Sequence, residues 1–486
     1  VNDLYVAGRR EGDRPFFTAK RLVLSLDWSH LVRRRPEFVI TSVDLTDWQM
    51  LVEKWKDGDS FPKVRKRPPS GSNGPSAYLV TVGYLHAWRG QFTYEDHESP
   101  WGVVAPNIDL SITKLAKYHG EARFNGGTVS IQEFVPMWAN FRARFVIDDD
   151  LIRLTRIDVD TDGAKTVASG VVDAAHFPEM SYAVQSRLQS PRLREIFFAG
   201  EPWPLSGPAD FNGTFRLFKG GHDLAGNFTA ETLGVYDYRF PRLYGSLRWT
   251  NNAFEIRNGG SQFYGGSSKF AFSAKPLGGP ERGTARFEFA YADVDLAQYT
   301  DFEQLPGLRF AGRATGRNLL EWKLGQFGAD HHGDGEIAVT APPGVEVMTA
   351  SLAAARAADP DHSLHEWGPF APTPLPAHLP IAGELTYRYD PAQLQFEGGR
   401  FATERTVAVF QGTTAWGPQT RIPFRVTSKD WQEGDQVLAG ILTDFGSRTG
   451  VVAVGGRGEF DGVMTGSFRR PRVEGVINGQ DVRAWD

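Results

Sequence analysis

The nearest approach to a metal-binding motif in the sequence is a run of alternating aspartates. Segment 158–163 resembles the opening of a calcium-binding loop, where closely spaced carboxylates on a turn converge on one cation. The position that should supply a bidentate glutamate is Ser169, and Ile157, Val159 and Thr161 alternate with the aspartates as they would in a strand. Carboxylates on one face of a strand lie about 6.6 Å apart. We therefore predict a solvated strand face and no metal site.

The histidines and glycine-rich segments give little support for catalysis. The two histidine clusters, His331-His332 and 362–366, do not reproduce the His-Glu-x-x-His spacing that places two metal ligands on one helix face. Segments 312–316 and 455–458 are not followed by a helix pattern, and a helix N-terminus is what lets such loops bind phosphate. No Gly-x-Ser-x-Gly elbow or P-loop is present. The sequence therefore predicts a non-enzymatic protein with no catalytic residue, metal or cofactor.

Charge and cysteine content exclude further classes of function. The formal net charge is −5, from 53 basic and 58 acidic side chains, so no broad positive field exists to gather a nucleic acid. Cysteine is absent, which excludes disulfides, thiolate nucleophiles and cysteine-based zinc sites. The densest basic runs are 65–67 and Arg33, Arg34 and Arg35. We expect the three arginines to be membrane-proximal and to contact anionic headgroups.

The elements that would position any site are strands. The 486 residues include 53 glycines, 34 phenylalanines, 14 tyrosines and 13 tryptophans. Aromatic and β-branched residues suit a pleated surface, and scattered glycines suit turns and bulges. We assign segments 89–90, 125–127 and 148–150 to turns between strands. The composition predicts an all-β fold of antiparallel strands with few short helices.

Apolar residues alternate with other residues along many segments, and this period of two puts one row on one face of a sheet. Leu22, Leu24 and Leu26 form the first such row. We expect the rows to line an apolar groove for lipid acyl chains, and the alternative is an ordinary β-sandwich core. The candidate groove-lining residues are Leu22, Leu24, Leu26, Leu247, Trp249, Phe270, Phe272, Phe287, Phe289 and Tyr291.

Internal self-similarity indicates how the chain is organised. Segments that begin at Leu151, Phe254 and Leu394 share one layout of strands separated by glycine-containing turns, which is typical of a stacked, elongated fold. The Ala-rich stretch 348–358 predicts a helix. We divide the chain into an N-terminal β module (1–66), a Pro/Gly-rich linker (67–76), repeating β-groove meanders (77–340), a helix with a Pro-rich insertion (341–380) and a further groove repeat (381–486).

These patterns resemble the AsmA/TamB-like family of bacterial envelope proteins. Segments 19–28, 39–45 and 57–62 are similar to the N-terminal module of AsmA-like proteins, and 171–173 with 177–178, 207–217 and 458–475 are similar to TamB. The resemblance spans nearly the whole chain and rests on alternation and glycine placement. It implies a twisted antiparallel sheet curled into a groove, apolar inside and polar outside, that bridges the inner and outer membranes. No catalytic residue carries over.

The resemblance and the residues together lead to a first function and two alternatives. The first is conduction of phospholipid acyl chains between the membranes along the groove. The second is a scaffold or chaperone that pairs its strand edges with client strands during outer-membrane protein assembly, with an outer-membrane barrel protein as partner. The third is a hydrolase that uses His362, His365 and Glu366.

We expect a periplasmic location for this chain. No stretch approaches the ~20 continuous apolar residues of a membrane-spanning helix. We expect the chain to be a piece of a longer protein, anchored in the inner membrane by a segment outside these residues. Phospholipid is the expected partner, and nucleic acid is not expected.

Overall fold

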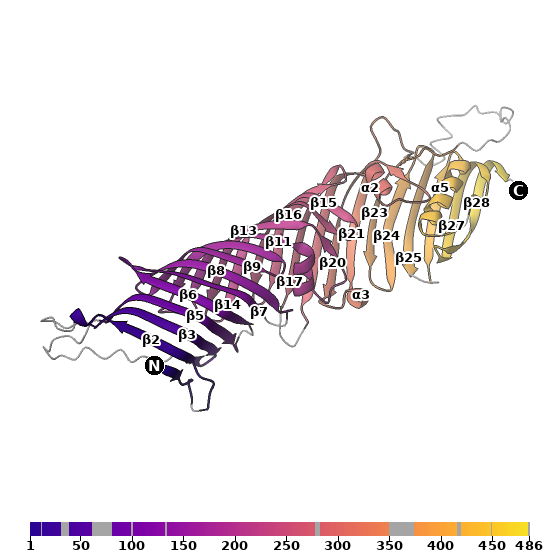
Figure 1. The fold of residues 1–486 in the computed structure, drawn as a ribbon. Coiled ribbons are helices and arrows are strands. Elements are labelled where there is room, and N and C mark those ends of the chain that lie inside the picture. The colour runs from indigo at the N-terminus through magenta and orange to yellow at the C-terminus, as the bar shows by residue number, and fades with distance from the viewer. Residues whose placement is uncertain are drawn as a thin grey trace. The chain divides into compact units, whose positions relative to one another are not determined.

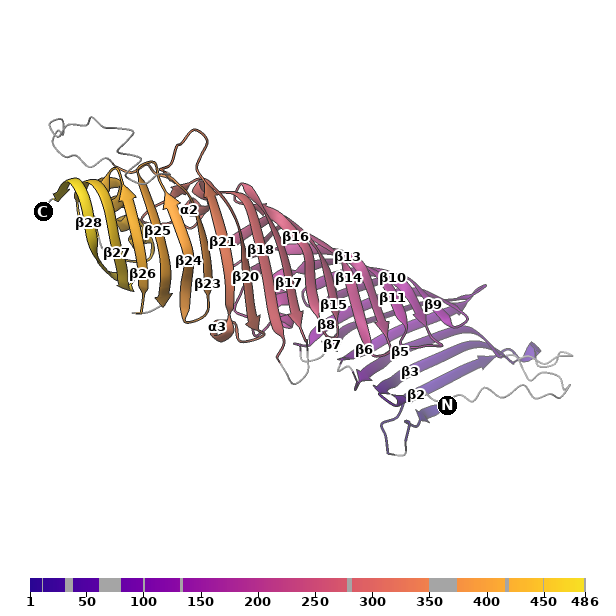
Figure 2. The ribbon, with the colours of Figure 1, turned by 180° about the vertical axis from the view of Figure 1, so that it is seen from behind.

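The computed structural model describes the chain except residue 11 and segments 31–37, 61–79, 99–100, 132–133, 278–281, 349–373, 416–418, 449 and 485–486. The protein is 68% strand and 8% helical, which confirms the predicted all-β class with few helices. Its strands pair into one large, mixed and open sheet (Figure 1, Figure 2). The predicted linker 67–76 lies outside the described residues, as does the predicted helix 348–358 apart from Met348.

Contacts divide the chain into two compact units. The first comprises Val1–Arg239, Tyr244–Ile256 and Lys275–Gly283, and the second comprises Phe240–Leu243, Arg257–Ala274 and Thr284–Asp486. The elements of the first unit are β1 (Asn2–Val6), β2 (Phe17–Leu26), η1 (Trp28–His30), β3 (Phe38–Trp55), β4 (Gly58–Asp59), β5 (Val80–Asp96), β6 (Trp101–Lys114), β7 (Tyr118–Ile131), β8 (Met137–Asp148), β9 (Leu151–Thr161), β10 (Ala164–Asp173), β11 (Met180–Gln189), α1 (Ser190–Phe197), β12 (Leu205–Ser206), β13 (Pro208–Phe218) and β14 (Gly221–Val235).

Three strands contribute residues to both units: β15 (Tyr238–Thr250), β16 (Phe254–Phe263) and β17 (Gly266–Lys275). The remaining elements belong to the second unit. They are β18 (Thr284–Asp295), α2 (Leu296–Phe302), β19 (Phe310–Ala311), β20 (Arg313–Lys323), α3 (Phe327–Asp330), β21 (His332–Thr340), β22 (Leu379–Pro380), β23 (Ala382–Tyr389), β24 (Gln393–Ala402), β25 (Thr406–Ala415), β26 (Arg421–Ser428), α5 (Trp431–Asp444), β27 (Val454–Ser467) and β28 (Arg470–Ala484).

Strands that follow one another in sequence are neighbours in the sheet. In the first unit the order runs β1-β2-β3-β5-β6-β7-β8-β9-β10-β11-β13-β14. In the second unit it runs β18-β20-β21-β23-β24-β25-β26-β27-β28, antiparallel throughout. Within the large sheet one described pairing is parallel, that of β3 with β5. A parallel pair needs a crossover of a dozen or more residues, and residues 56–79 supply that length.

The pairing register separates apolar from polar side chains. Phe287 and Phe289 of β18 lie opposite Leu320 and Asn318 of β20, and both phenylalanines are half-buried. Between them, Glu288 is exposed on the other face of the strand. The alternation seen in the sequence therefore gives each strand an apolar and a polar face, as predicted.

Two segments that we assigned to turns lie inside strands. Residues 89–90 are within β5 and 125–127 are within β7, and the pairing register shifts at both places. Arg89, Asp47 and Asn107 each have φ of 52°, so neighbouring strands β5, β3 and β6 all carry a left-handed residue at the same level. The turn assignment was wrong there because a β-bulge uses the same residue types but bends the strand without ending it. Segment 148–150 does connect β8 to β9.

Glycines and aromatic rings face one another across neighbouring strands. Gly335 of β21 is directly opposite Tyr387 of β23, and Gly399 of β24 is opposite Phe410 of β25. A Cβ atom on either glycine would overlap the facing ring, so the ring lies over bare backbone. The same arrangement recurs at Gly120–Phe145, Gly170–Tyr182, Gly316–Tyr291 and Gly383–Phe401. The high glycine and aromatic content thus has a packing reason, and it flattens the apolar lining.

Candidate functional site

The predicted groove residues of the second unit lie together on its apolar face. Phe270 contacts Phe287 with ring centroids 6.3 Å apart, and Phe272 contacts Trp322 at 6.2 Å. Phe289 stands 6.0 Å from the ring of Phe287 and 6.0 Å from that of Tyr291. Further half-buried apolar side chains lie on the same face of the following strands, namely Leu320, Ile337, Leu385, Phe396 and Phe424. These residues form an apolar surface over β17 to β26.

The leucine row near the N-terminus lies on the apolar face of the first unit. Leu22, Leu24 and Leu26 of β2 are opposite Leu45, Val43 and Ile40 of β3 respectively. Leu45 packs against the core cluster of Ala19, Trp48 and Ala87, so the row adjoins a buried core. Leu24 is exposed, whereas its two neighbours in the row are half-buried. Arg33, Arg34 and Arg35 lie outside the described residues.

Trp249 belongs to an aromatic cluster of the first unit. Its ring lies 5.2 Å from Phe197 of α1, 6.3 Å from Phe134 and 4.6 Å from His222 of β14. Leu247, two residues earlier on β15, is half-buried. Burial lowers the pKa of His222. Its Nε2 has no hydrogen-bond partner in the described part of the chain, so the ring is neutral and acts as part of an apolar surface.

A contact between distant strands shows that the sheet of the first unit curls. Phe177, in the connection between β10 and β11, packs against Tyr94 of β5 with ring centroids 6.3 Å apart. Both contact the buried cluster that contains Phe16 and Val52. Five strand spacings separate β5 from β10, a distance of about 24 Å in a flat sheet. Because the two rings touch, the apolar face must turn inward in this part of the unit.

Helix α5 covers part of the apolar face of the second unit and lies against β27 (Figure 1). Leu442 of α5 packs with Ile422 of β26 and Met464 of β27 in a buried cluster. At the end of the helix, the Asp444 carboxylate accepts hydrogen bonds from the backbone N–H groups of Gly307 at 2.7 Å and Leu308 at 3.1 Å. The helix therefore joins the strands at the C-terminal side of the unit to the connection between β18 and β20.

A group of uncharged polar side chains interrupts this apolar face. The Asn318 amide donates to the Tyr389 hydroxyl at 3.2 Å, which in turn donates to the Leu319 carbonyl at 3.0 Å. The Tyr387 hydroxyl lies 3.5 Å from the amide oxygen of Asn318. Burial raises the pKa of Tyr389 to about 12, and it also raises the pKa of Tyr387 and Tyr291. These hydroxyls stay protonated at neutral pH and supply hydrogen bonds but no general base.

A buried ion pair lies at the end of the apolar row on β3 and β5. Lys54 Nζ is 2.9 Å from Asp96 Oδ2, and the two side chains are 9% and 3% exposed. Lys54 follows Val52 by two residues and Asp96 follows Tyr94 by two, so the pair lies on the same face as those apolar side chains. Burying two charges costs desolvation free energy. The apolar surface of the first unit therefore ends at a fixed polar boundary.

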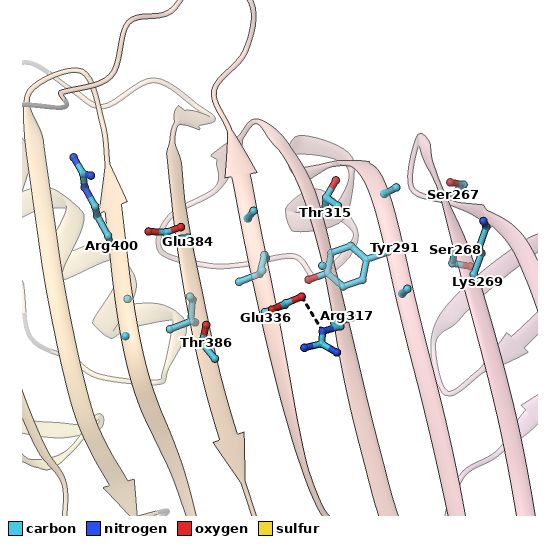
Figure 3. A pocket seen from close by; sticks show the side chains of 18 of the residues that line it. Ser267, Ser268, Lys269, Tyr291, Thr315, Arg317, Glu336, Glu384, Thr386 and Arg400 are labelled. Carbon is cyan, nitrogen blue, oxygen red and sulfur yellow. Dashed lines mark hydrogen bonds and ion pairs between the residues drawn. The ribbon is translucent and has the colours of Figure 1, made fainter.

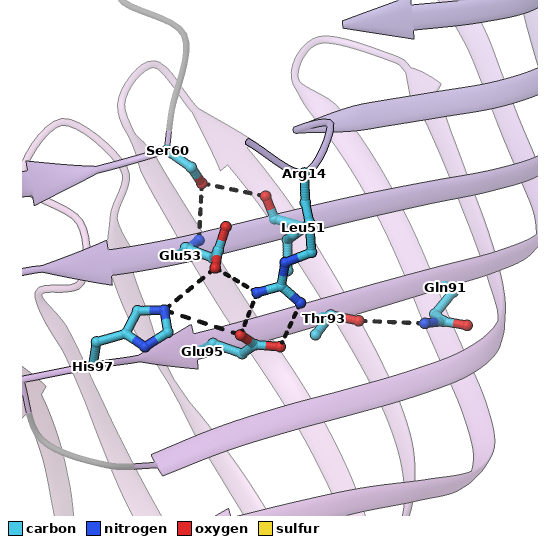
Figure 4. A network of polar contacts seen from close by, with 8 residues as sticks. All are labelled: Arg14, Leu51, Glu53, Ser60, Gln91, Thr93, Glu95 and His97. Carbon is cyan, nitrogen blue, oxygen red and sulfur yellow. Dashed lines mark hydrogen bonds and ion pairs between the residues drawn. The ribbon is translucent and has the colours of Figure 1, made fainter. Parts of the chain in front are cut away.

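The described residues contain one group whose ligand atoms are close enough to hold a metal ion, namely Glu53, Glu95 and His97. Figure 4 shows the Arg14 guanidinium between the two carboxylates. It is hydrogen-bonded to Glu53 and lies 3.2 Å from Glu95 Oε1, while His97 Nε2 is 3.3 Å from Glu53 Oε1. Hydrogen bonds to Glu95 and Glu53 raise the pKa of Arg14. A permanent cation thus already neutralises the carboxylates, and the group is an ion-pair network.

Sequence reasoning missed this network because its members are distant in the chain. Arg14 is 39 residues from Glu53 and 81 residues from Glu95. The two glutamates come together only because β3 and β5 pair in parallel register, with Glu53 opposite Glu95. No local spacing in the sequence signals a parallel pair of this kind.

A cavity of about 990 Å³ lies in the second unit against strands β17 to β25 (Figure 3). Its lining includes Tyr291, Ile337 and Leu385 of the apolar rows, together with charged side chains of the other face, among them Lys269, Arg317, Glu384 and Arg400. Arg317 Nε is paired with Glu336 at 2.8 Å. The lining contains both signs of charge and no histidine, and it has no nucleophile held by a base. The cavity therefore combines charged side chains with part of the apolar rows.

The motifs that resembled chemical sites occupy ordinary strands. Asp158 lies on β9 and pairs with Arg156 at 2.7 Å, and Asp162 pairs with Arg192 at 2.6 Å. The strand prediction for the aspartate run is thereby confirmed. Segment 455–458 lies within β27, and 312–316 leads into β20. His331 Nδ1 is 2.8 Å from the Phe327 carbonyl, and the cluster 362–366 lies outside the described residues.

None of the helices that the structure describes is long and apolar enough to cross a membrane. Comparisons with protein families, with curated proteins and with solved structures give no match to this chain.

Proposed function

We propose that the chain is a non-enzymatic stretch of a lipid conduit, whose apolar face shields phospholipid acyl chains between the inner and outer membranes. The observation that carries the proposal is the apolar surface over β17 to β26, where many large apolar side chains are only half-buried. A surface of this size is costly in water. Acyl chains would remove it from water without needing specific polar contacts.

The shape of the lining fits acyl chains. Aromatic rings lie over glycines on the neighbouring strand, as at Gly316 and Gly335, so few side chains stand up from the apolar face. Acyl chains make non-directional contacts and need a smooth apolar wall rather than a shaped pocket. The polar face carries the charged residues, including the Arg317–Glu336 pair. An apolar inside and a polar outside are the properties that the resemblance to AsmA/TamB-like proteins implies.

A periplasmic location, an inner-membrane anchor outside this chain and membership of the AsmA/TamB-like family are parts of the same proposal. The absence of cysteine is compatible with an extracytoplasmic protein whose stability rests on burial. Phospholipid is the proposed partner, and the proposal includes no catalytic step, metal or cofactor.

Native mass spectrometry of the purified chain tests the proposal. We expect phospholipid to remain bound after purification from cells that contain both membranes. A photo-crosslinking amino acid in place of Ile337, on the uncovered part of the apolar face, should form a lipid adduct. A preparation that carries no lipid, and forms no adduct when phospholipid is added, would contradict the proposal.

Charge placed on the apolar face gives a matched comparison. Phe289→Asp puts a carboxylate in the apolar row and should abolish the lipid adduct, as should Phe272→Asp. Ala290→Asp puts the same carboxylate on the exposed polar face of the same strand, and its adduct should equal that of the wild type. Circular dichroism and thermal unfolding of all three variants establish that the fold survives. Equal loss in the control would mean that the effect does not come from the apolar face.

A second candidate function rests on β28. Within the described part of the chain this strand of 15 residues is paired on one side, with β27, and nearly all its residues are exposed. An unpaired strand edge can accept a further strand, as a scaffold for outer-membrane protein assembly would require. Crosslinks from Val476 to a barrel protein, without lipid adducts at Ile337, would favour the scaffold over the conduit.

A further inference from the structure

Exposed apolar residues lie along α5 and its connection to β27. Leu438, Phe445, Val451 and Val452 are between 40% and 66% exposed, although all four are large apolar side chains. Val452 is held beside the helix because its backbone N–H donates to the Asp435 carboxylate at 3.0 Å. A cluster of this kind within one short segment is unusual on a protein surface that faces only water.

Three arginines lie near Phe445, at the C-terminal end of α5. The Phe445 ring stacks on Phe468 at 4.5 Å, and Phe468 is followed by Arg469 and Arg470. Arg469 also lies next to Gly446, two residues before Arg448. All three arginines are exposed, and none forms an ion pair with a carboxylate in the described part of the chain. The apolar cluster therefore has unneutralised positive charge at its border.

The nearest acidic groups of α5 are already engaged. The Asp435 carboxylate accepts backbone N–H groups of Val452 and Ala453, at 3.0 and 2.8 Å. The Asp444 carboxylate accepts those of Gly307 and Leu308. Both carboxylates are therefore engaged by backbone groups, and in the described part of the chain neither forms an ion pair with the three arginines.

We propose that this surface, defined by Leu438, Phe445, Val451, Val452, Arg448, Arg469 and Arg470, docks on an anionic lipid bilayer. Valine and phenylalanine side chains bury in the acyl region of a bilayer interface, while arginines at the same depth bind phosphate oxygens of the headgroups. A protein partner would call for polar groups that match its own, whereas a bilayer needs only apolar area and positive charge. The inference rests on the proposed lipid function, because it places a membrane contact next to the helix that covers the groove.

The exposed residues of strand β28 form a surface that differs from this one in its charged groups. Its exposed residues Val473, Val476 and Val482 are interspersed with Glu474 and Asp481. Glu474 is paired with Arg472, and Asp481 lies 3.9 Å from Arg457, so this surface carries ion pairs rather than arginines without a carboxylate partner. The two surfaces therefore provide a test patch and a matched control within one unit.

Vesicle co-flotation of the full chain tests the proposal. We expect the wild type to float with vesicles of phosphatidylcholine containing phosphatidylglycerol, and to stay in solution with phosphatidylcholine alone. Replacing Arg448, Arg469 and Arg470 by glutamine should weaken binding on the order of 100-fold at low salt. The control, glutamine at Lys165, Arg216 and Lys219 of the first unit, removes the same charge and should leave binding within about two-fold of wild type.

A second pair of variants tests how much the apolar side chains contribute to vesicle binding. Val451→Ser with Val452→Ser should weaken binding about ten-fold, whereas Val476→Ser with Val482→Ser on β28 should have no effect. Because the chain has no cysteine, Val452→Cys accepts a single environment-sensitive fluorophore. Its emission should shift to the blue when anionic vesicles are added.

Three results would overturn the docking surface. They are equal binding to neutral and anionic vesicles, equal loss in the test and control variants, and no spectral shift at position 452. Lipid carried by the same preparations is measured separately by native mass spectrometry. If the chain carries lipid but does not bind vesicles, only the proposed docking surface is contradicted. If it binds vesicles but carries no lipid, only the proposed conduit is contradicted.

Discussion

Asp444, the last residue of α5, accepts a hydrogen bond from the backbone N–H of Leu308, 136 residues earlier in the chain, at 3.1 Å. A carboxylate at the C-terminal end of a helix opposes the helix dipole. In this structure the unfavourable interaction of the Asp444 carboxylate with the helix dipole is offset by its hydrogen bonds, because the same carboxylate also accepts the Gly307 N–H at 2.7 Å. The side chain thus fixes the end of α5 to the connection between β18 and β20.

We predict that Asp444→Ala releases this end of α5. The two N–H groups lose a charged acceptor, which should lower the free energy of unfolding by about 2 kcal/mol. Hydrogen exchange should increase at 303–309 and in the last turn of α5. Asp461→Ala serves as the control, because it removes an exposed ion pair with Arg425 on the polar face and should change the free energy of unfolding far less. Unchanged exchange in Asp444→Ala would show that Leu442 packing alone holds the helix.

Two adjacent glycines of β24 should respond differently to the same substitution. A Cβ on Gly399 would overlap the Phe410 ring, whereas a Cβ on Gly398 meets nothing within 4 Å. Gly399→Ala must displace a ring that also contacts Phe396 and Phe401, so we expect a loss of about 1–3 kcal/mol in stability. Gly398→Ala should be neutral or slightly stabilising. Denaturant midpoints of the two variants provide the measurement, and equal midpoints would contradict the ring-on-glycine packing.

Much of the fold could be predicted because alternation is a local property. The period of two at Phe287, Phe289 and Tyr291 correctly placed these residues on one face of a strand. Segments 89–90 and 125–127 were misassigned because a bulge and a turn both favour a left-handed residue. Sequence alone does not show whether the strand resumes in the same direction or reverses.

The rest of the site depends on contacts between distant segments. The Arg14 network requires the parallel pairing of β3 with β5, which only tertiary structure fixes. Helix α5 was also missed, because two glycines, Gly434 and Gly440, lower its helix propensity by about 1 kcal/mol each. Its sequence does carry one signal, an aspartate at position 430 that caps the Gln432 N–H at 3.1 Å. Packing of Leu442 on β26 and β27 compensates for the weak propensity.

The buried pair of Lys54 and Asp96 should be sensitive to removal of one partner. Lys54→Met leaves a 3% exposed carboxylate without its cation, and we expect a loss of about 3 kcal/mol in the free energy of unfolding. Replacing both residues, as Lys54→Met with Asp96→Leu, should recover most of that loss. Arg89→Met breaks the exposed pair with Asp47, whose side chains are 61% and 37% exposed, and should leave the free energy of unfolding almost unchanged. Equal losses at the two sites would contradict a buried pair.

The acid stability of the first unit should depend on Arg14. Its hydrogen bond to Glu95 holds the pKa of that carboxyl below the ordinary value of 4.5. A group with a depressed folded pKa contributes stability above its unfolded pKa and loses it as pH falls through the folded pKa. We therefore expect the wild type to lose stability on acidification below about pH 4.5.

Arg14→Gln brings the folded pKa of Glu95 closer to its unfolded value, so less stability remains to be lost. Its unfolding free energy should be lower than that of the wild type at pH 7, and the two curves should converge as the pH approaches 3. Denaturant titrations across this range give the curves, and the carboxyl chemical shift of Glu95 gives its pKa directly. Arg123→Gln, which releases Asp109 of β6 instead, is the control and should leave the Glu95 titration unchanged. Parallel curves for Arg14→Gln and wild type would mean that Glu95 does not depend on Arg14 for its charge.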